Sequence, residues 1–588
     1  MQFAVDFETY YEAQDRYSLA SLGPDAYVRH AKFDPYLVAV TGADGSAYAG
    51  DPRRFDWTGL RGQELWSHNA RFDHAVYLEG ARRGWWPRVE FASWDCTADL
   101  AVYNGHRRSL KDASRSLFGI AVDKRVRDEM RDKVFADLAH EDRKRVSDYA
   151  LDDARLCLKI AQALSWPSME RFISRQTRQL GFRGIRVDLP AARASLTQLF
   201  EIKETAAKLL PWVAEAEDPE KIVTPLSLQK LRETCRKSGI PAPSSLAQDA
   251  EECRVWEDHY GTRFPWVGAM RDWRRSNIIY RKIETLLSRT FDETFYFSLK
   301  YFGAHTGRFA GTDRFNMQNL PRASFFGVDL RKLLVPRPGK VMVCLDLAQI
   351  EPRTLMTLIG DRESLQAVRA GISVYEIHAQ RTMSWSGNEL KKEDARLYAL
   401  AKARVLSLGY GCGASRFKLM AKTYCDLDLT DDESFAVVSQ FRRSNPAIVG
   451  LWRDLDNALK WSAQKGEDYA IELPNGRRLT YRQPHFVEGS RSVSACVAFG
   501  DAPRKFYGGK LLENLVQAVA RDIFVEAVLH RLEQVGYEIL FHVHDEVVLE
   551  CDPDVDTREI ENIVAQPLPW FAECPLAGEA KVTRHYVK

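Results

Sequence analysis

The chain has 588 residues and a formal net charge of +2, so its length excludes a single small domain and its global charge does not indicate a polyanionic partner. Its ten cysteines are scattered without CxxC spacing, which indicates a reduced protein rather than a disulfide framework or a zinc site. Two acids interrupt the first apolar stretch and no apolar run reaches about eighteen residues, so we expect a soluble, cytoplasmic chain with no signal peptide and no membrane contact.

From residue 1 to about 165, strand-like and helix-like segments alternate, and three short motifs in this region carry acids. Asp6 and Glu8 alternate on a predicted strand, so both side chains leave the same face. Asp73 follows Asn69 at the spacing of one helical turn. A third motif at 149–153 gives a fourth acid, so four carboxylates on three separate elements can converge.

In the third motif, Tyr149 and Asp153 lie one helical turn apart. Asp148 and Asp152 are each one residue, or about 100° of helix, away from these two positions. We interpret Asp148 and Asp152 as solvated helix acids.

The segment SWP at 165–167 predicts a domain boundary, and residues 168–300 are mostly helical by periodicity. This helical region contains a cationic stretch with interleaved aromatic residues, which suits contact with phosphates; a solvated helix face is the alternative. The expected phosphate contacts are Arg271, Arg274, Arg275 and Lys282.

Beyond residue 300, strand signals at 341–347 and 537–550 flank a largely helical insert, which predicts a split sheet. Asp346 and Asp545 each close one of these apolar runs, and a buried carboxylate there needs a cation. Two such acids brought together by folding are the usual cradle for two divalent metals about 3.5–4 Å apart.

The acidic motifs of the first 165 residues resemble those of DEDD-type 3′→5′ exonucleases with a tyrosine in the third motif. The resemblance implies that four acids hold two Mg²⁺ ions and that Tyr149 orients the attacking water. These acids are Asp6, Glu8, Asp73 and Asp153.

Later segments resemble family A DNA polymerases: DLAQIEPR (346–353) and the HDE of 544–546 as motifs A and C, and AKARVLSLGYG (401–411) as motif B. Further matches are FGAHTGRFA (302–310), NMQNLP (316–321), VYEIHAQ (374–380) and KLLENLVQAVARD (510–522). Lys402, Leu406 and Tyr410 share one face of the predicted motif B helix. Two departures are Tyr398, where the family has arginine, and Leu406, where it has phenylalanine or tyrosine.

The resemblance implies that Asp346 and Asp545 bind the catalytic metals and that Glu351 lies beside C2′ of the incoming sugar. The nucleotide-binding residues it implies are Lys402, Leu406, Tyr410, Glu351, His378 and Gln349. The DNA-binding residues it implies are Arg308, Gln517, His544, Asn316, Gln318 and Asn319.

The expected fold class is α/β multidomain, with a ribonuclease H-like exonuclease domain at 1–165 and a right-hand polymerase domain at 166–588. Within the latter we expect a thumb at about 185–300, a palm at about 301–355 and 490–588, and fingers at about 356–489. Because the acidic motifs begin at residue 6, no 5′-nuclease domain is expected ahead of them.

We therefore predict a DNA-dependent DNA polymerase with 3′→5′ proofreading, replicative and phage-encoded. Its expected ligands are primer-template DNA, dNTPs and two Mg²⁺ ions per active site, with Mn²⁺ as a substitute. It is expected to act as a monomer in the host cytoplasm and to recruit replisome accessory proteins.

Two alternatives are a single-subunit RNA polymerase and a catalytically inert, DNA-binding replisome scaffold. A carboxylate at Glu351 would crowd a ribose hydroxyl, which argues against the first. The completeness of both acid sets argues against the second.

Overall fold

The computed structural model describes residues 1–587 except 215–223, 247–250, 314 and 322–323. The N-terminal region forms a mixed five-stranded sheet in the order β3-β2-β1-β4-β5. Its strands are β1 (Gln2–Thr9), β2 (Pro35–Gly42), β3 (Ala47–Gly50), β4 (Glu64–Ser67) and β5 (Ser93–Cys96). β1 runs antiparallel to β2 and parallel to β4, so it lies at the centre of the sheet.

Helices cover both faces of this sheet. Ala4 on β1 packs into a cluster with α7 (His140–Ala163), whereas Val5 and Phe7 pack into a second cluster with α3 (Ala70–Arg82). Alternation along the strand therefore sends even-numbered β1 side chains toward α7. The shorter helices here are α1 (Leu19–Leu22), α2 (Pro24–Arg29), α4 (Thr97–Tyr103), α5 (Leu110–Phe118) and α6 (Arg125–Glu129).

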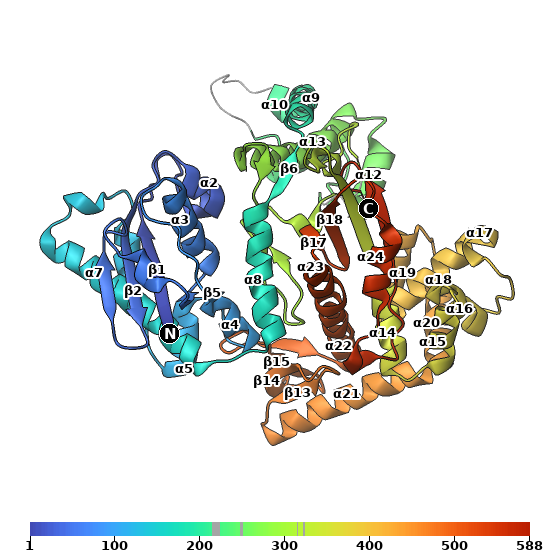
Figure 1. Cartoon of the computed structure of the whole chain (residues 1–588). Helices are drawn as coiled ribbons and strands as arrows, with labels where there is room; N and C mark the ends of the chain where they lie inside the picture. Colours follow the sequence, from blue (N-terminus) through green and yellow to red (C-terminus); the bar gives the residue numbers. More distant parts are fainter. Residues whose placement is uncertain (215–223, 247–250, 314, 322–323, 588) are drawn as a thin grey trace.

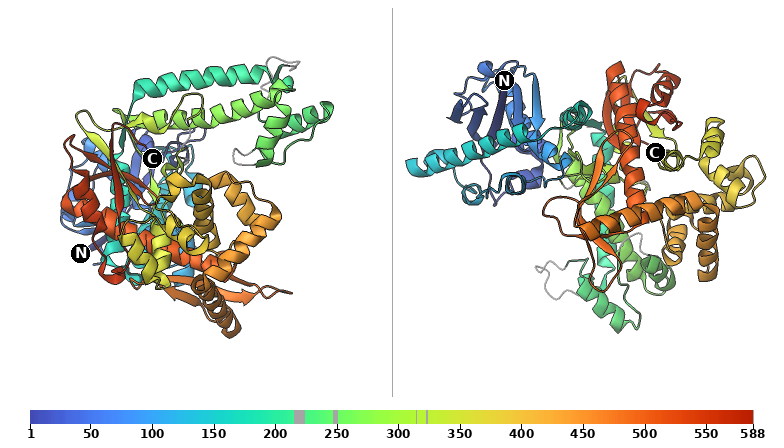
Figure 2. Two further views of the ribbon diagram at one scale, coloured as in Figure 1. Left: turned by 90° about the vertical axis from the view of Figure 1, so that its right-hand side faces the viewer. Right: turned by 90° about the horizontal axis from the view of Figure 1, so that it is seen from below.

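After the predicted boundary, α8 (Ser168–Arg183) runs between the N-terminal region and the rest of the molecule (Figure 1). The long helices α9 (Leu189–Lys208) and α13 (Pro265–Ser288) then pack along each other and project from the body (Figure 2). The short helices α10 (Pro211–Ala214), α11 (Leu228–Lys237) and α12 (Glu251–Tyr260) lie near them. A small sheet at their base has the order β11-β6-β8-β7, formed by β6 (Ile185–Val187), β7 (Thr290–Phe291), β8 (Thr294–Phe295) and β11 (Leu334–Val335).

The centre of the molecule is an antiparallel sheet in the order β17-β18-β12-β19. It joins β12 (Val341–Leu347) to β17 (Glu538–Val543), β18 (Glu546–Cys551) and β19 (Gly578–Thr583), which confirms the predicted split sheet. The long helix α22 (Gly508–Ile523) continues through a π-helical turn at 524–530 into α23 (Arg531–Val535), and α24 (Thr557–Ala565) packs beside β19.

Seven helices form a cluster to one side of this sheet: α14 (Ile350–Leu358), α15 (Arg362–Arg369), α16 (Val374–Thr382), α17 (Leu390–Glu393), α18 (Ala395–Leu408), α19 (Ala414–Cys425) and α20 (Asp431–Ser444). None of the helices described by the structure combines the length and apolar character needed to cross a membrane.

The expectation of a largely helical insert is wrong beyond α21 (Pro446–Lys465). A sheet of β13 (Tyr469–Glu472), β14 (Arg478–Phe486), β15 (Val493–Cys496) and β16 (Arg504–Phe506) lies at the lower edge in Figure 1, away from the helical cluster. The Asn475-Gly476 dipeptide between β13 and β14 is a strong hairpin signal that the helical interpretation overlooked.

Two candidate active sites

The four N-terminal acids come from the three predicted elements. Asp6 and Glu8 lie on the face of β1 that α7 covers, since they share the alternation of Ala4. Asp153 is buried on α7 with Tyr149 one turn before it. Asp148 and Asp152 are exposed on the same helix, as expected for solvated acids.

Asp73 reaches the same site from the opposite side of the sheet. It lies in the first turn of α3, and its carboxylate accepts a hydrogen bond from the backbone N–H of Phe7 at 3.1 Å. Asn69, immediately before the helix, has a positive φ of 77° that turns the chain from β4 into α3. A backbone contact therefore fixes Asp73 to the strand that carries Asp6 and Glu8.

The acids raise one another's pKa. Burial, with Asp153 as a second cause, raises the pKa of Glu8 to about 7. Burial also raises the pKa of Asp6 well above its ordinary value, with Asp73 and Glu8 adding to the shift. The pKa of Asp73 is raised for the same reason, although the Phe7 N–H opposes the shift. Carboxylates that destabilise one another's charge in this way favour a cation between them.

Lys124 was missed by the sequence analysis. Its ammonium nitrogen lies 3.2 Å from Asp153 Oδ2 and 3.4 Å from the Tyr149 hydroxyl. It lowers the pKa of both Asp6 and Glu8. Lys124 precedes α6 in a loop without periodicity, so no sequence signal set it apart from neighbouring basic residues.

Oxygen donors of this kind fit Mg²⁺, which binds through one or two carboxylates together with water and substrate phosphates. Among the described residues, however, no three acidic, histidine or cysteine side chains lie close enough together to form a complete metal-binding group. Instead, the cation beside the Asp153 carboxylate is the ammonium group of Lys124.

The second candidate site is built by strand register. Asp346 at the end of β12 pairs with Glu546 on β18, and the backbone N–H of Leu347 donates to the carbonyl of Asp545 at 3.1 Å. Asp545 and His544 occupy the tight turn between β17 and β18, where His544 has a φ of 56°. Two aspartates 199 positions apart in sequence therefore lie at adjacent strand ends.

Residues predicted to touch nucleotide and DNA gather beside these aspartates. Arg308 forms an ion pair with Glu351 on α14. Burial raises the pKa of Tyr410, and the nearby Glu351 adds to the shift. Arg308 and Asp545 also line one small cavity of about 20 Å³. Gln517 on α22 donates to Glu513 at 3.2 Å, so its amide nitrogen is held within its own helix.

The motif B helix, α18, carries Lys402 and Leu406, and Tyr410 follows its end. Leu406 is 39% exposed, which is unusual for a leucine of its size, and Lys402 on the same face is half-buried. The end of the helix closely approaches α22, because a Cβ on Gly509 would lie 2.3 Å from the carbonyl oxygen of Tyr410. Glycine at 509 therefore allows Tyr410 to reach the floor of the site.

A buried ion-pair network lies behind the floor. Arg521 on α22 binds Glu170 on α8 at 2.9 Å and Asp522 at 3.0 Å, and Arg477 binds Asp522 at 2.9 Å. Sequence analysis could not find this network, because Glu170 and Arg521 are 351 residues apart. It fixes α22 against the helix that leaves the N-terminal region.

Two predicted contact residues also have structural roles. Gln318 is buried, and its amide donates to the carbonyl of His542 at 2.8 Å and accepts from the N–H of His544 at 2.8 Å. Gln349 donates to Ser373 at 3.0 Å and accepts from the N–H of Val374 at 3.0 Å. These bonds fix the orientation of both amides but use only one of the two N–H donors of each, so their contacts with DNA and nucleotide stay predictions.

The segment around Gln318 also differs from expectation. The Asn316 side chain accepts from the backbone N–H of Gln318 at 2.9 Å and caps a short 3₁₀ turn (317–319). Asn319 is exposed, and its carbonyl accepts from Lys282 at 3.1 Å. Asn316 therefore shapes the turn, while Asn319 alone of these side chains faces outward.

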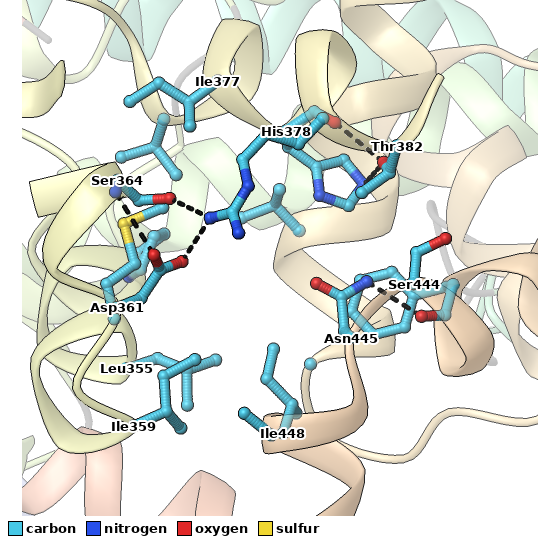
Figure 3. A pocket seen from close by; sticks show the side chains of 18 of the residues that line it. Leu355, Ile359, Asp361, Ser364, Ile377, His378, Thr382, Ser444, Asn445 and Ile448 are labelled. Carbon is cyan, nitrogen blue, oxygen red and sulfur yellow. Dashed lines mark hydrogen bonds and ion pairs between the residues drawn. The ribbon is translucent and has the colours of Figure 1, made fainter. Parts of the chain in front are cut away.

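His378 does not face the aspartates. It lines a separate cavity of about 410 Å³ within the helical cluster, beside Thr382 and Phe441 (Figure 3). Burial, with Arg404 as a further cause, lowers its pKa to about 3, so it carries no positive charge at neutral pH. A neutral imidazole still has one N–H to donate, so the contact with a nucleotide phosphate stays a prediction.

Two of the four predicted phosphate contacts on α13 already form ion pairs within the protein. Arg271 is 1% exposed and pairs with Glu257 at 3.0 Å, so it is not available to phosphates. Arg275 pairs with the same carboxylate at 2.7 Å. Arg274 and Lys282 are half-buried, which leaves the predicted phosphate-binding surface much smaller than expected.

Residues 256–587 match the model of the family described as DNA polymerase family A. The DNA polymerase of Bacillus phage SP02 is 25% identical over 463 residues, which cover 70% of this chain and 69% of the phage protein. The thermostable DNA polymerase I of Thermus thermophilus is 29% identical over 253 residues, but these span only 27% of its length. The solved POL domain of Pol1 from M. smegmatis, in complex with DNA primer-template and dNTP, matches 99% of this chain and 95% of that domain at a TM-score of 0.69 and 18% identity.

Proposed function

The chain belongs to DNA polymerase family A, and from that premise we propose that it is a replicative, phage-encoded polymerase that also proofreads through its N-terminal acids. The proposed ligands are primer-template DNA and dNTPs, bound by a monomer. The polymerase assignment rests above all on Asp346 and Asp545, which the sheet register holds at adjacent strand ends.

In the proposed reaction the primer 3′ hydroxyl attacks the α-phosphate of a dNTP and pyrophosphate leaves. Family A polymerases use divalent metal ions, which neutralise charge on the attacking and leaving oxygens; we propose Mg²⁺ here. Asp346 and Asp545 would hold these ions, with the substrate phosphates supplying further oxygens. Lys402 would neutralise the triphosphate from the fingers.

Glu351 would exclude a ribose hydroxyl, and its position is fixed by the ion pair with Arg308. When a primer-template binds, we propose that Arg308 exchanges this carboxylate for a minor-groove acceptor of the terminal base pair. Tyr410 would stack near the templating base, and His544 would position the primer end.

We propose that residues 1–165 form a ribonuclease H-like 3′→5′ exonuclease domain with Asp6, Glu8, Asp73 and Asp153 as metal ligands. The mutual pKa shifts of three of these acids support a cation at this site. Lys124 would be displaced from Asp153 when the metal binds. Tyr149 would orient the attacking water.

For the remainder we propose a thumb at about 185–300, fingers made by α14–α20, and a palm that includes the central sheet. The sheet β13–β16 and α21 would belong to the palm side rather than to the fingers.

Primer extension with dNTPs or rNTPs, in Mg²⁺ and with an EDTA control, tests the polymerase. Extension with dNTPs alone is expected. Release of 3′ nucleotides from labelled single-stranded DNA, without dNTPs, tests the exonuclease.

A further inference from the structure

A groove of about 720 Å³ lies between the N-terminal region and the palm side of the molecule, apart from both acidic sites. One wall is formed by residues 102–108, which are the end of α4 and the loop that leads to α5. The opposite wall comes from residues 300–305 and from 476–504 of the sheet β13–β16. These segments meet at the lower edge in Figure 1, where α4 approaches β14 and β15.

The groove is strongly cationic. Seven arginine and lysine side chains line it, against a single acid, Asp501. Several of the arginines pair with acids, as the exposed Arg478 does with the exposed Glu472 at 3.2 Å. Among the described residues Lys300 and Arg504 have no ion-pair partner, and both are exposed.

Three polar nitrogens at the groove are buried without a hydrogen-bond partner. They are Arg477 Nη1, Arg482 Nε and His305 Nε2. Arg477 is only 7% exposed, so its remaining donor has no access to bulk water. The two arginine nitrogens are donors, buried donors are normally satisfied, and an anion in the groove would accept from them.

An aromatic side chain lies at the edge of the groove. Phe499 is 40% exposed and is held between the His106 ring, at 4.7 Å, and the Arg482 guanidinium, at 3.6 Å. Cationic grooves with interleaved aromatic side chains are the usual means of binding single-stranded nucleic acid, whose bases are free to stack. A closed duplex offers its phosphates but no exposed base faces.

The two walls are joined to each other. The N–H of Phe499 donates to the carbonyl of Gly105 at 2.9 Å, and Arg107 pairs with Asp501 at 3.0 Å. Gly105 has a φ of 79°, and a Cβ there would lie 2.7 Å from the Arg482 guanidinium, so a larger residue would disturb the junction. The groove is therefore a fixed feature built by both parts of the chain.

We propose that this groove binds single-stranded DNA through its phosphates, with the exposed edge of Phe499 packing against a base. The proposal rests on the proposed function, since it assumes a DNA substrate. Two sources of single strand share this chemistry: the unpaired template ahead of the primer, and a melted primer 3′ end directed toward the acids of β1.

The test is the affinity of the full-length chain for DNA, measured by fluorescence anisotropy in EDTA over a range of salt concentrations. Three primer-templates share one duplex: the first has a one-nucleotide 5′ template overhang, the second a ten-nucleotide overhang, and the third a mismatched primer 3′ end. The variant carries Lys300→Gln with Arg504→Gln, the two exposed cations of the groove that have no ion-pair partner among the described residues. The matched control, Arg558→Gln with Lys581→Gln, removes two exposed cations from α24 and β19.

Wild type should bind the ten-nucleotide overhang or the mismatched end more tightly than the one-nucleotide overhang. In the groove variant that gain should shrink, and the slope of log affinity against log salt should fall by about 0.7 per lost single-strand contact, or about 1.4 for both. The substrate that shows this effect identifies which strand enters the groove. The control should retain the wild-type slope.

An unchanged slope on both single-stranded substrates would overturn the proposal, and so would an equal fall on the one-nucleotide overhang, since the groove would then contact duplex. Extension of that same overhang by one dNTP in Mg²⁺, measured with wild type, tests the polymerase assignment separately. A wild type that binds through the groove but does not extend would refute the proposed function alone.

Discussion

The two acidic sites are built in different ways. In the N-terminal site, side chains from β1, α3 and α7 are buried together, and burial first and repulsion between the carboxylates second raise the pKa of Asp6, Glu8 and Asp73. In the central sheet, two aspartates are positioned by strand register and by the hydrogen bond from the Leu347 N–H to the Asp545 carbonyl. The first site holds buried, mutually repelling carboxylates that a cation would stabilise, whereas the position of the second pair is set by the backbone geometry of the sheet. This difference predicts that a substitution in one site abolishes the activity of that site and leaves the other activity intact.

The largest effect is expected from removing the acids themselves. Asp346→Ala or Asp545→Ala should reduce primer extension by about 10³-fold or more, since several kcal/mol of charge stabilisation are lost. Degradation of single-stranded DNA from its 3′ end should persist. Asp6→Ala combined with Glu8→Ala should give the opposite pattern, measured with the same labelled DNA in Mg²⁺.

A smaller effect is expected from replacing Glu351, the residue proposed to exclude a ribose hydroxyl. Glu351→Ala removes the carboxylate beside C2′ and frees Arg308 from its ion pair. The ratio of rNTP to dNTP incorporation should rise by about 10- to 100-fold, the range of 1–3 kcal/mol of discrimination. Steady-state efficiencies for matched rNTP and dNTP pairs would measure it. An unchanged ratio would mean that another side chain forms the gate.

Leu406 gives a prediction about how strongly the central site discriminates against dideoxynucleotides. Its exposed face has no donor or acceptor, so wild type should discriminate strongly against dideoxynucleotides. Leu406→Tyr should relax this discrimination by about 10-fold, the value of one hydrogen bond of about 1.4 kcal/mol. The comparison needs the Asp6→Ala, Glu8→Ala background, since excision would mask incorporation. Ready use of dideoxynucleotides by wild type would show that Leu406 does not face the sugar.

The raised pKa of Glu8 should make the Tm of the metal-free N-terminal region depend on pH. The ordinary pKa of Glu8 is 4.5 and its folded value is about 7, so its contribution is fully present below about pH 4.5 and is lost as the pH rises through 7. In EDTA the Tm of the N-terminal unit should therefore rise on going from pH 8 to pH 5.5, on the order of 5 °C.

Differential scanning calorimetry in EDTA can measure this change. Glu8→Gln should raise the Tm at pH 8 and flatten the pH dependence. Asp152→Asn, at an exposed position on α7, serves as the matched control and should leave both unchanged. A Tm that falls on acidification in wild type would contradict the raised pKa of Glu8.

Short-range patterns allowed part of this description to be predicted from sequence. Alternation placed Asp6 and Glu8 on one strand face, and helical spacing separated Asp153 from the exposed Asp152. The acids at the ends of two apolar runs identified Asp346 and Asp545 as strand-end neighbours.

The remaining features depend on tertiary partners that a sequence does not name. A glutamine that contacts DNA and one that clamps backbone, such as Gln318, look alike until the fold is known. Arg271 appeared to be a surface cation, but Glu257 pairs with it inside the structure. No sequence pattern indicated Lys124, because its role depends on an ion pair with Asp153 on a different element.

The central claim is that one chain carries two independent sites. The most direct test uses a primer with a mismatched 3′ end and two variants mixed together, Asp545→Ala and Asp6→Ala with Glu8→Ala. Alone, the first should only shorten the primer and the second should extend it poorly, with the mismatch retained. The mixture should excise the mismatch and then extend the corrected primer to full length. Failure of the mixture to produce corrected product, or loss of both activities in either folded variant, would contradict the claim.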